Sequence, residues 1–222
     1  MLQFTVEPQG APLALAPRRL LIVGYTGRDQ TAVAQHIAEL REHGIPAPAR
    51  TPALYALAPE RLTTADTIQV VGNTTSGEGE FVLVFTGDEL YVGVGSDHTD
   101  RDLERLSVPR AKQVCPKPVS ARLWRWADVR ATWDRCRLRS WSDDTLYQDG
   151  SVAELLSPEA ILALARDRVG DVTDSAIYCG TLPLVEGAIC FDRRFAAALV
   201  DPTAGRELRC AYTVEAVADL DT

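Results

Sequence analysis

The residues of this sequence whose types and spacing could do chemistry are acidic. Glu78 and Glu80 lie two residues apart where the apolar run EFVLVF begins. Residues i and i+2 of a strand point to the same face, and two carboxylates there repel each other unless a cation lies between them. Oxygen ligands suit Mg²⁺, Mn²⁺ or Ca²⁺. Taken alone, however, E-x-E at a strand start is more often a solvent-exposed pair.

Asp97 strengthens the metal interpretation. The runs EFVLVF and ELYVGVG are separated by 86–88, Thr-Gly-Asp, which predicts a β-hairpin. The end of its second strand returns beside the start of its first, so Asp97 is expected near Glu78 and Glu80. Three clustered carboxylates need a cation. Alternatively, or in addition, Asp97 caps the helix that follows.

Two histidines are candidate acid–base groups. His36 and Glu39 are three residues apart on a predicted helix and face the same side, so Glu39 could orient His36 as a general base on water. A surface pair without function has the same spacing. His98 directly follows Asp97 and alternation points it away from that residue. It is either a second acid–base group or a buried histidine bonded to the backbone.

The elements that must position these residues are mostly strands. We expect a strand over 19–24, a helix over 31–44 that Asp29 caps, and an extended proline-rich connector over 45–59. Further short strands are expected at 68–72, 80–85, 89–95, 120–126, 132–140, 175–179, 188–190 and 208–214, with helices at 100–106 and 158–170. No βαβ alternation is present, so the pattern predicts an α+β, mostly β, mixed roll or barrel-like body. We place a small N-terminal α/β lid region at 1–67 and a metal-binding body at 68–222.

Composition excludes several classes of protein. The chain has 222 residues, a net charge of −8 and a pI of about 4.9, which disfavours nucleic-acid binding. No apolar run is long enough to span a membrane, and the N-terminus does not have the pattern of a signal peptide. The five cysteines are scattered without a CxxC pair, which is typical of buried thiols in the reducing cytoplasm. The four tryptophans are expected to pack in the core or at a dimer interface.

Several motifs in order resemble the fumarylacetoacetate hydrolase superfamily, within it a branch of unknown function that carries the string SDHTDR. They are SGEGEFVLV, SDHTDRDLE, AKQVCPKPV, TLYQDG with LLSPEAILAL, and GDVTDSAIYCGTLPLVEG. Their order and spacing agree from about residue 19 to 190. The resemblance implies a fumarylacetoacetate hydrolase fold, a homodimer and a divalent metal ion, with Mg²⁺ expected and Mn²⁺ or Ca²⁺ as alternatives.

The resemblance also assigns roles. It implies that Glu78, Glu80 and Asp97 bind the metal and that Lys112 lies beside it. Groups expected to hold an acylpyruvate-like substrate are Arg101, Gln148, Gly180 and Thr181. Glu104 departs from the family, which has glutamine there. Of the family's lid motif, this sequence keeps only H-x-x-E, at His36 and Glu39. The Asn-Tyr pair of the family motif is replaced here.

The implied function is metal-dependent hydrolysis of a carbon–carbon bond in an acylpyruvate-like 2-keto acid through a metal-stabilised enolate. The same chemistry supports a lyase or isomerase, namely a 2-keto acid decarboxylase, a hydratase or dehydratase, or a tautomerase. A third alternative is a non-catalytic small-molecule binding protein. The departures at the lid and at Glu104 motivate it.

Overall fold

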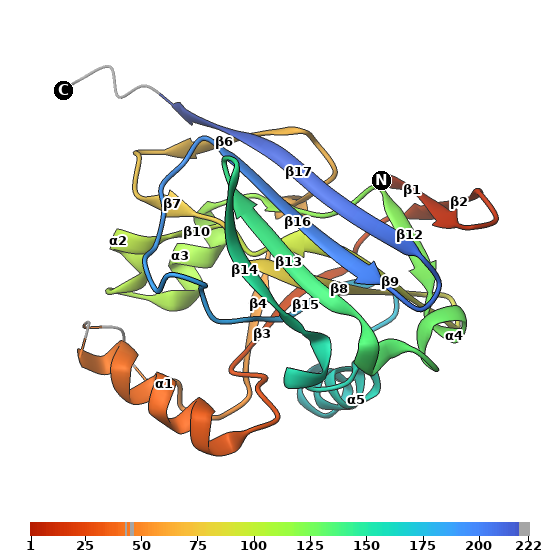
Figure 1. Ribbon diagram of the computed structural model, residues 1–222, viewed down its shortest axis with the longest axis horizontal. Helices are drawn as coiled ribbons and strands as arrows, with labels where there is room; N and C mark the ends of the chain where they lie inside the picture. The colour runs from red at the N-terminus through yellow and green to blue at the C-terminus, as the bar shows by residue number, and fades with distance from the viewer. Residues whose placement is uncertain (43, 45–46, 218–222) are drawn as a thin grey trace.

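A computed structural model describes residues 1–42, 44 and 47–217, and it consists of two packed β-sheets with helices at their edges (Figure 1). The larger sheet has the strand order β2-β1-β12-β9-β8-β15-β3-β4. Its strands are β1 (Leu2–Glu7), β2 (Ala11–Leu15), β3 (Arg19–Gly24), β4 (Ala53–Leu57), β8 (Gly79–Thr86), β9 (Glu89–Ser96), β12 (Arg122–Arg125) and β15 (Ser175–Thr181). The predicted mostly β, barrel-like fold class is confirmed.

The smaller sheet has the order β14-β13-β16-β17-β6 and lies across the larger one (Figure 1). Its strands are β6 (Thr67–Val71), β13 (Arg137–Ser142), β14 (Thr145–Ser151), β16 (Arg194–Asp201) and β17 (Arg206–Val217). Two short ladders pair β10 (Thr99–Asp100) with β7 (Thr75–Ser76), and β11 (Lys117–Pro118) with β5 (Leu62–Thr63).

The helices are α1 (Gln30–Glu42), α2 (Arg101–Glu104), α3 (Val108–Val114), α4 (Trp126–Val129) and α5 (Pro158–Val169), with 3₁₀ turns η1 (Pro59–Arg61), η2 (Trp133–Arg135) and η3 (Val152–Glu154). In Figure 1, α2 and α3 lie together at one side of the sheets, and α1 lies below them. No helix in the described parts of the chain is long and apolar enough to cross a membrane.

Strand β8 is the centre of the molecule because both of its faces are covered. Phe81 and Leu83 point into the core between the two sheets, and Val82 and Val84 point into the core on the opposite face. All four are fully buried, which explains why this strand is a continuous apolar run rather than an alternating one. The acidic residues Glu78 and Glu80 lie at the start of this strand, whose two faces are both packed.

Several predicted elements are confirmed and others differ. The hairpin is present, with Thr86 paired to Glu89, and Asp29 caps α1 by accepting from the Thr31 and Ala32 backbone N–H groups. The predicted connector 45–59 contains β4, and the strand predicted at 188–190 is wrong, because the strand in this region, β16, begins at Arg194. Strands β1 and β2 and helix α3 were not predicted. Strand β1 joins the sheet through β12, a distant partner that local patterns do not show.

The N-terminal region 1–67 is continuous with the rest of the fold. Its strands β1 to β4 belong to the same sheet as β8, β9, β12 and β15. Strand β3 pairs in parallel with β15, a strand more than a hundred residues away in sequence. The expected boundary at residue 67 therefore separates strands that hydrogen bond within one sheet.

Candidate metal centre

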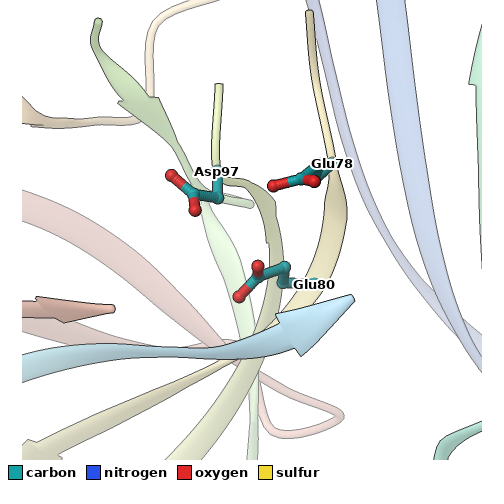
Figure 2. Close-up of side chains that lie close together, drawn as sticks. All are labelled: Glu78, Glu80 and Asp97. Atoms are coloured by element: carbon teal, nitrogen blue, oxygen red, sulfur yellow. The ribbon is translucent and has the colours of Figure 1, made fainter. Parts of the chain in front are cut away.

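The hairpin β8–β9 brings the three acidic residues together. Gly79 pairs with Ser96 and Glu80 with Gly95, and the Asp97 N–H donates to the Glu78 carbonyl at 3.0 Å. One carboxylate oxygen from each of Glu78, Glu80 and Asp97 lies within 4.8 Å of the other two. Figure 2 shows the three carboxylates converging from the two strands. The predicted juxtaposition of Asp97 with the E-x-E pair is confirmed.

The three carboxylates differ in burial and hydrogen bonding. Asp97 is 0% exposed and Glu80 2% exposed, whereas the Glu78 side chain retains 22% of its exposure. Glu80 Oε2 accepts from the Gly180 N–H at 2.8 Å. Burial, then the charges of Asp97 and Glu78, raise the pKa of Glu80 well above its usual value. A divalent cation would relieve this repulsion.

Asp97 has one oxygen without a hydrogen bond. Its Oδ2 accepts from the Lys112 ammonium, but its buried Oδ1 has no hydrogen-bond partner. Burial by itself would raise the pKa of Asp97, but the positive charges of Lys112 and Lys117 lower it to about 2. An ionised carboxylate with a buried oxygen that accepts no hydrogen bond matches the donor chemistry that a hard cation requires.

The helix that follows is not capped by Asp97. The N-cap of α2 is Asp100, whose carboxylate accepts from the Asp102 and Leu103 N–H groups. Capping therefore does not compete for the Asp97 oxygens.

Lys112 and Arg101 surround the carboxylates with positive charge. Lys112, on α3, also lies 3.7 Å from Glu78, and although burial opposes it, Asp97, Glu78 and Glu104 raise the pKa of its ammonium. Arg101 donates to Ser76 and Glu104 and lies 3.3 Å from Glu78. The Arg101 guanidinium thus contacts other groups of the protein. One of them is Glu104, which stands where the resembled family has glutamine.

Gln148 holds the start of β8 in place. Its amide oxygen accepts from the Gly79 N–H and the Ser140 hydroxyl, and its amide nitrogen donates to Thr181 Oγ1 and the Leu182 carbonyl. All four hydrogen-bonding sites of the amide are thereby used. The resemblance implies that Gln148 contacts a substrate. In the structure its amide joins β8, β14 and β15 through hydrogen bonds.

Gly180 and Thr181 form the other wall. Gly180 has a φ of +89°, and a Cβ there would lie 2.0 Å from Thr26 Oγ1, so only glycine fits. The Thr26 hydroxyl donates to the Cys179 carbonyl, and Thr181 Oγ1 donates to the Gly79 carbonyl at 2.9 Å. The segment after β3 is thus packed against the strand that contacts Glu80.

His98 lies behind the carboxylates. Its ring nitrogens are 2.9 Å from the Tyr212 hydroxyl and 2.9 Å from the Thr75 hydroxyl. The Tyr212 hydroxyl also lies 2.8 Å from the Ser96 hydroxyl, so the imidazole belongs to a chain of buried polar groups. Burial, then Lys117 and Arg101, lower the pKa of His98 to about 3. The imidazole is neutral and bonded on both sides, which favours the buried-histidine alternative over a catalytic role.

The lid dyad is only partly described. His36 and Glu39 both lie on α1, and Glu39 is exposed. The side chain of His36 lies outside the described part of the structure. The predicted dyad therefore stays a prediction.

Sequence reasoning missed two groups of the site. Lys117, on β11, is fully buried and its Nζ lies 3.1 Å from Asp97 Oδ1. Tyr25, directly after β3, has a φ of +60°, and burial, then Tyr55 and Glu104, raise its pKa to about 12. Lys117 lies within the motif AKQVCPKPV, but the resemblance assigned no role to it. A lysine between two prolines and a tyrosine after an apolar run are ordinary in loops.

A rolled mostly β body with a carboxylate cluster at the start of its central strand defines a protein of the fumarylacetoacetate hydrolase fold. The chain belongs to the family described as protein of unknown function (DUF2848), whose model matches residues 23–212. The predicted fold is confirmed, and so is the prediction that the chain belongs to a family of unknown function. No curated protein matches the sequence.

Solved structures share this fold at low sequence identity. A candidate fumarylacetoacetate isomerase/hydrolase from Oleispira antarctica has a TM-score of 0.71 and 17% identity, over 97% of this chain and 100% of that one. A fumarylpyruvate hydrolase from Pseudomonas aeruginosa, in complex with Mn²⁺ and pyruvate, has a TM-score of 0.66 and 15% identity, over 97% and 96%. A 5-carboxymethyl-2-hydroxymuconate delta-isomerase from Mycobacterium smegmatis has a TM-score of 0.65 and 15% identity, over 92% and 81%.

Proposed function

We propose that this protein is a divalent-metal-dependent enzyme that hydrolyses a carbon–carbon bond in an acylpyruvate-like 2-keto acid. The observation that carries the proposal is the convergence of three carboxylates on one face, with a buried Asp97 oxygen that accepts no hydrogen bond. Glu78, Glu80 and Asp97 would hold the ion. The similar fold of a hydrolase solved with Mn²⁺ and pyruvate supports this assignment.

The ion would act as a Lewis acid toward the carbonyl of the 2-keto acid. Lys112 adds a fixed positive charge at the edge of the site and keeps Asp97 ionised. Arg101 orients Glu78 from one side, and the Gly180 N–H orients Glu80 from the other. The protein thus contributes a preorganised set of oxygens and a cationic rim that favours an anionic substrate.

Hydrolysis also needs a group that activates water. We assign this role to His36, oriented by Glu39, because H-x-x-E on α1 is the general-base pattern in this chain and His98 is already bonded on both sides. An isomerase or lyase would need enolate formation but no activated water. The isomerase among the similar folds supports that second candidate.

A direct test is turnover of a panel of acylpyruvates and 2-keto acids by chelator-treated protein to which Mg²⁺ or Mn²⁺ is returned. We expect loss of enol absorbance only with metal, and no turnover by Asp97→Asn. The matched control is Asp171→Asn, an exposed carboxylate paired to Arg18. Metal binding without turnover of any compound would support a binding protein instead, and unchanged activity in Asp97→Asn would exclude the proposed site.

His36→Ala separates hydrolase from isomerase. If His36 activates water, the variant loses product formation but still exchanges the substrate α-proton with solvent, which NMR in D₂O detects. If the protein is an isomerase or lyase, product formation persists in His36→Ala.

We also propose that the protein works in the cytoplasm, with thiols reduced. All five cysteines are free, and four of them are buried. The homodimer expected from the resemblance stays a prediction, which light scattering on the purified chain would check.

A further inference from the structure

Lys117 is a second buried cation at Asp97 that the proposed chemistry does not use. Its side chain is 0% exposed. Its Nζ donates to the His98 carbonyl and lies 3.1 Å from Asp97 Oδ1. Lys112 donates to the other oxygen of the same carboxylate. Asp97 is therefore held between two ammonium groups, one at each oxygen.

The backbone of Lys117 is fixed as firmly as its side chain. Its residue pairs with Leu62 in the β11–β5 ladder, and its carbonyl accepts from the Tyr178 hydroxyl at 2.9 Å. The ammonium consequently cannot move away from Asp97 without breaking buried contacts. A charge fixed in this way acts on whatever Asp97 Oδ1 binds.

Stability alone gives a weak reason for this lysine. Desolvating an ammonium opposes folding, and buried ion pairs are often no better for stability than apolar residues of similar volume. The His98 carbonyl needs only a neutral donor. What distinguishes a lysine here is an ammonium group 3.1 Å from the oxygen that is available to a metal.

Charge balance shows what that ammonium changes. The site joins four carboxylates, from Glu78, Glu80, Asp97 and Glu104, to three cations, from Arg101, Lys112 and Lys117. With all groups ionised, one negative charge is in excess, and a divalent ion reverses the sign to one positive charge. That value matches a monoanionic 2-keto acid. Without Lys117 the metal-loaded site would be neutral.

Resting on the proposed function, we propose that Lys117 is a positioning and specificity-determining residue that weakens divalent-metal binding at Asp97 and strengthens binding of the substrate carboxylate to the loaded site. Like charges at short range in a buried site interact strongly, so the ammonium repels the ion and attracts the anion. The two affinities are therefore set in opposite directions by one side chain.

The test measures both affinities separately. Mn²⁺ is titrated into chelator-treated protein by calorimetry, with free Mn²⁺ counted by electron paramagnetic resonance, and pyruvate is then titrated into Mn²⁺-saturated protein. For Lys117→Met we expect Mn²⁺ to bind about tenfold more tightly and pyruvate about tenfold more weakly than in the wild type. A lysine that only supported the fold would lower both affinities together.

Two further variants make the result specific. Lys117→Gln is neutral but its amide can donate to the His98 carbonyl, so it should show the same opposite shifts and carries the test if Lys117→Met does not fold. Arg18→Met removes one exposed positive charge far from the site in sequence and should change neither affinity. Wild-type behaviour in Lys117→Gln, or a fall of both affinities, would overturn the inference and leave the proposed function standing. Failure of the wild type to bind Mn²⁺ would overturn both.

Discussion

At the scale of single residues, the site stores unfavourable interactions that a metal ion would relieve. Glu80 is buried beside two other carboxylates, an arrangement that costs free energy in the metal-free protein. Residues that bind a cation are expected to lower the free energy of unfolding of the metal-free protein and to raise that of the metal-bound protein. This property distinguishes a binding site from an ordinary buried ion-pair network.

Glu80→Gln tests that property. The amide oxygen can still accept from the Gly180 N–H, while the repulsion with Asp97 and Glu78 is removed. We expect the unfolding midpoint without metal to be unchanged or higher, and the rise in midpoint caused by Mn²⁺ to disappear. Differential scanning calorimetry measures both, with Glu89→Gln at the exposed end of the same hairpin as the control. A full Mn²⁺ response in Glu80→Gln would contradict the site.

Gly180→Ala tests the wall that holds Glu80. The new methyl group would meet Thr26 Oγ1 and would occupy a backbone conformation with φ of +89°. We expect a loss of more than about 2 kcal/mol in the free energy of unfolding together with weaker Mn²⁺ binding. Gly205→Ala is the matched control, since it also has positive φ, +63°, but no atom within 4 Å of the new Cβ. Equal losses in the two variants would show that the contact with Thr26 has no effect.

At the scale of elements, the turn between β16 and β17 is fixed by one buried carboxylate. Asp201 ends β16 and its carboxylate accepts from the Thr203 and Ala204 N–H groups, from the Thr132 hydroxyl and from Arg206. Burial opposes ionisation, but these donors together lower the pKa of Asp201 below its usual value. The turn between β16 and β17 is therefore tied to the segment before β13.

This lowered pKa predicts a pH dependence. A carboxyl group whose pKa falls on folding stabilises the fold above its unfolded-state pKa, about 3.9, and the stabilisation is lost as pH falls through the lower folded value. We expect Asp201→Asn to lower the unfolding free energy at pH 7 and to reduce the steepness of acid unfolding. Urea unfolding at several pH values measures this, with the exposed Asp88→Asn as the control. If the free energy of unfolding of Asp201→Asn fell with acid as steeply as that of the wild type, the predicted role of Asp201 would be contradicted.

At the scale of the whole molecule, the candidate site connects the two sheets. The three clustered carboxylates lie at the start of β8 and just after the end of β9, and Ser96 at the end of β9 accepts from the hydroxyl of Tyr212 on β17. The N-terminal strands join the same large sheet. Metal binding at the site should consequently stabilise the entire described chain rather than one part of it.

We therefore expect a single cooperative unfolding transition that Mn²⁺ or Mg²⁺ shifts as a whole. An ion at a hundred times its dissociation constant adds about 2.7 kcal/mol to the free energy of unfolding. Calorimetry with and without chelator measures this. Two transitions, of which the metal moves only one, would show that 1–67 unfolds as an independent unit.

Local patterns in the sequence determined the hairpin and therefore the acidic cluster. The apolar runs on either side of Thr86-Gly87-Asp88 define two strands, and antiparallel pairing by itself returns Asp97 to Glu78 and Glu80. The same local signals identify α5 from Ser157-Pro158 and the cap at Asp29. These features depend on neighbours within about twenty residues, which is why the sequence was sufficient.

Only the tertiary structure decided what surrounds the carboxylates. Lys117 reaches Asp97 through the β11–β5 ladder, Gly180 reaches Glu80 from β15, and His98 is satisfied by Tyr212 from the other sheet. Each of these contacts joins segments whose proximity results from packing two sheets, which no local periodicity encodes. Side chains compatible with many environments, such as a lysine between prolines or a histidine after an aspartate, acquire their role from the partners that the fold supplies.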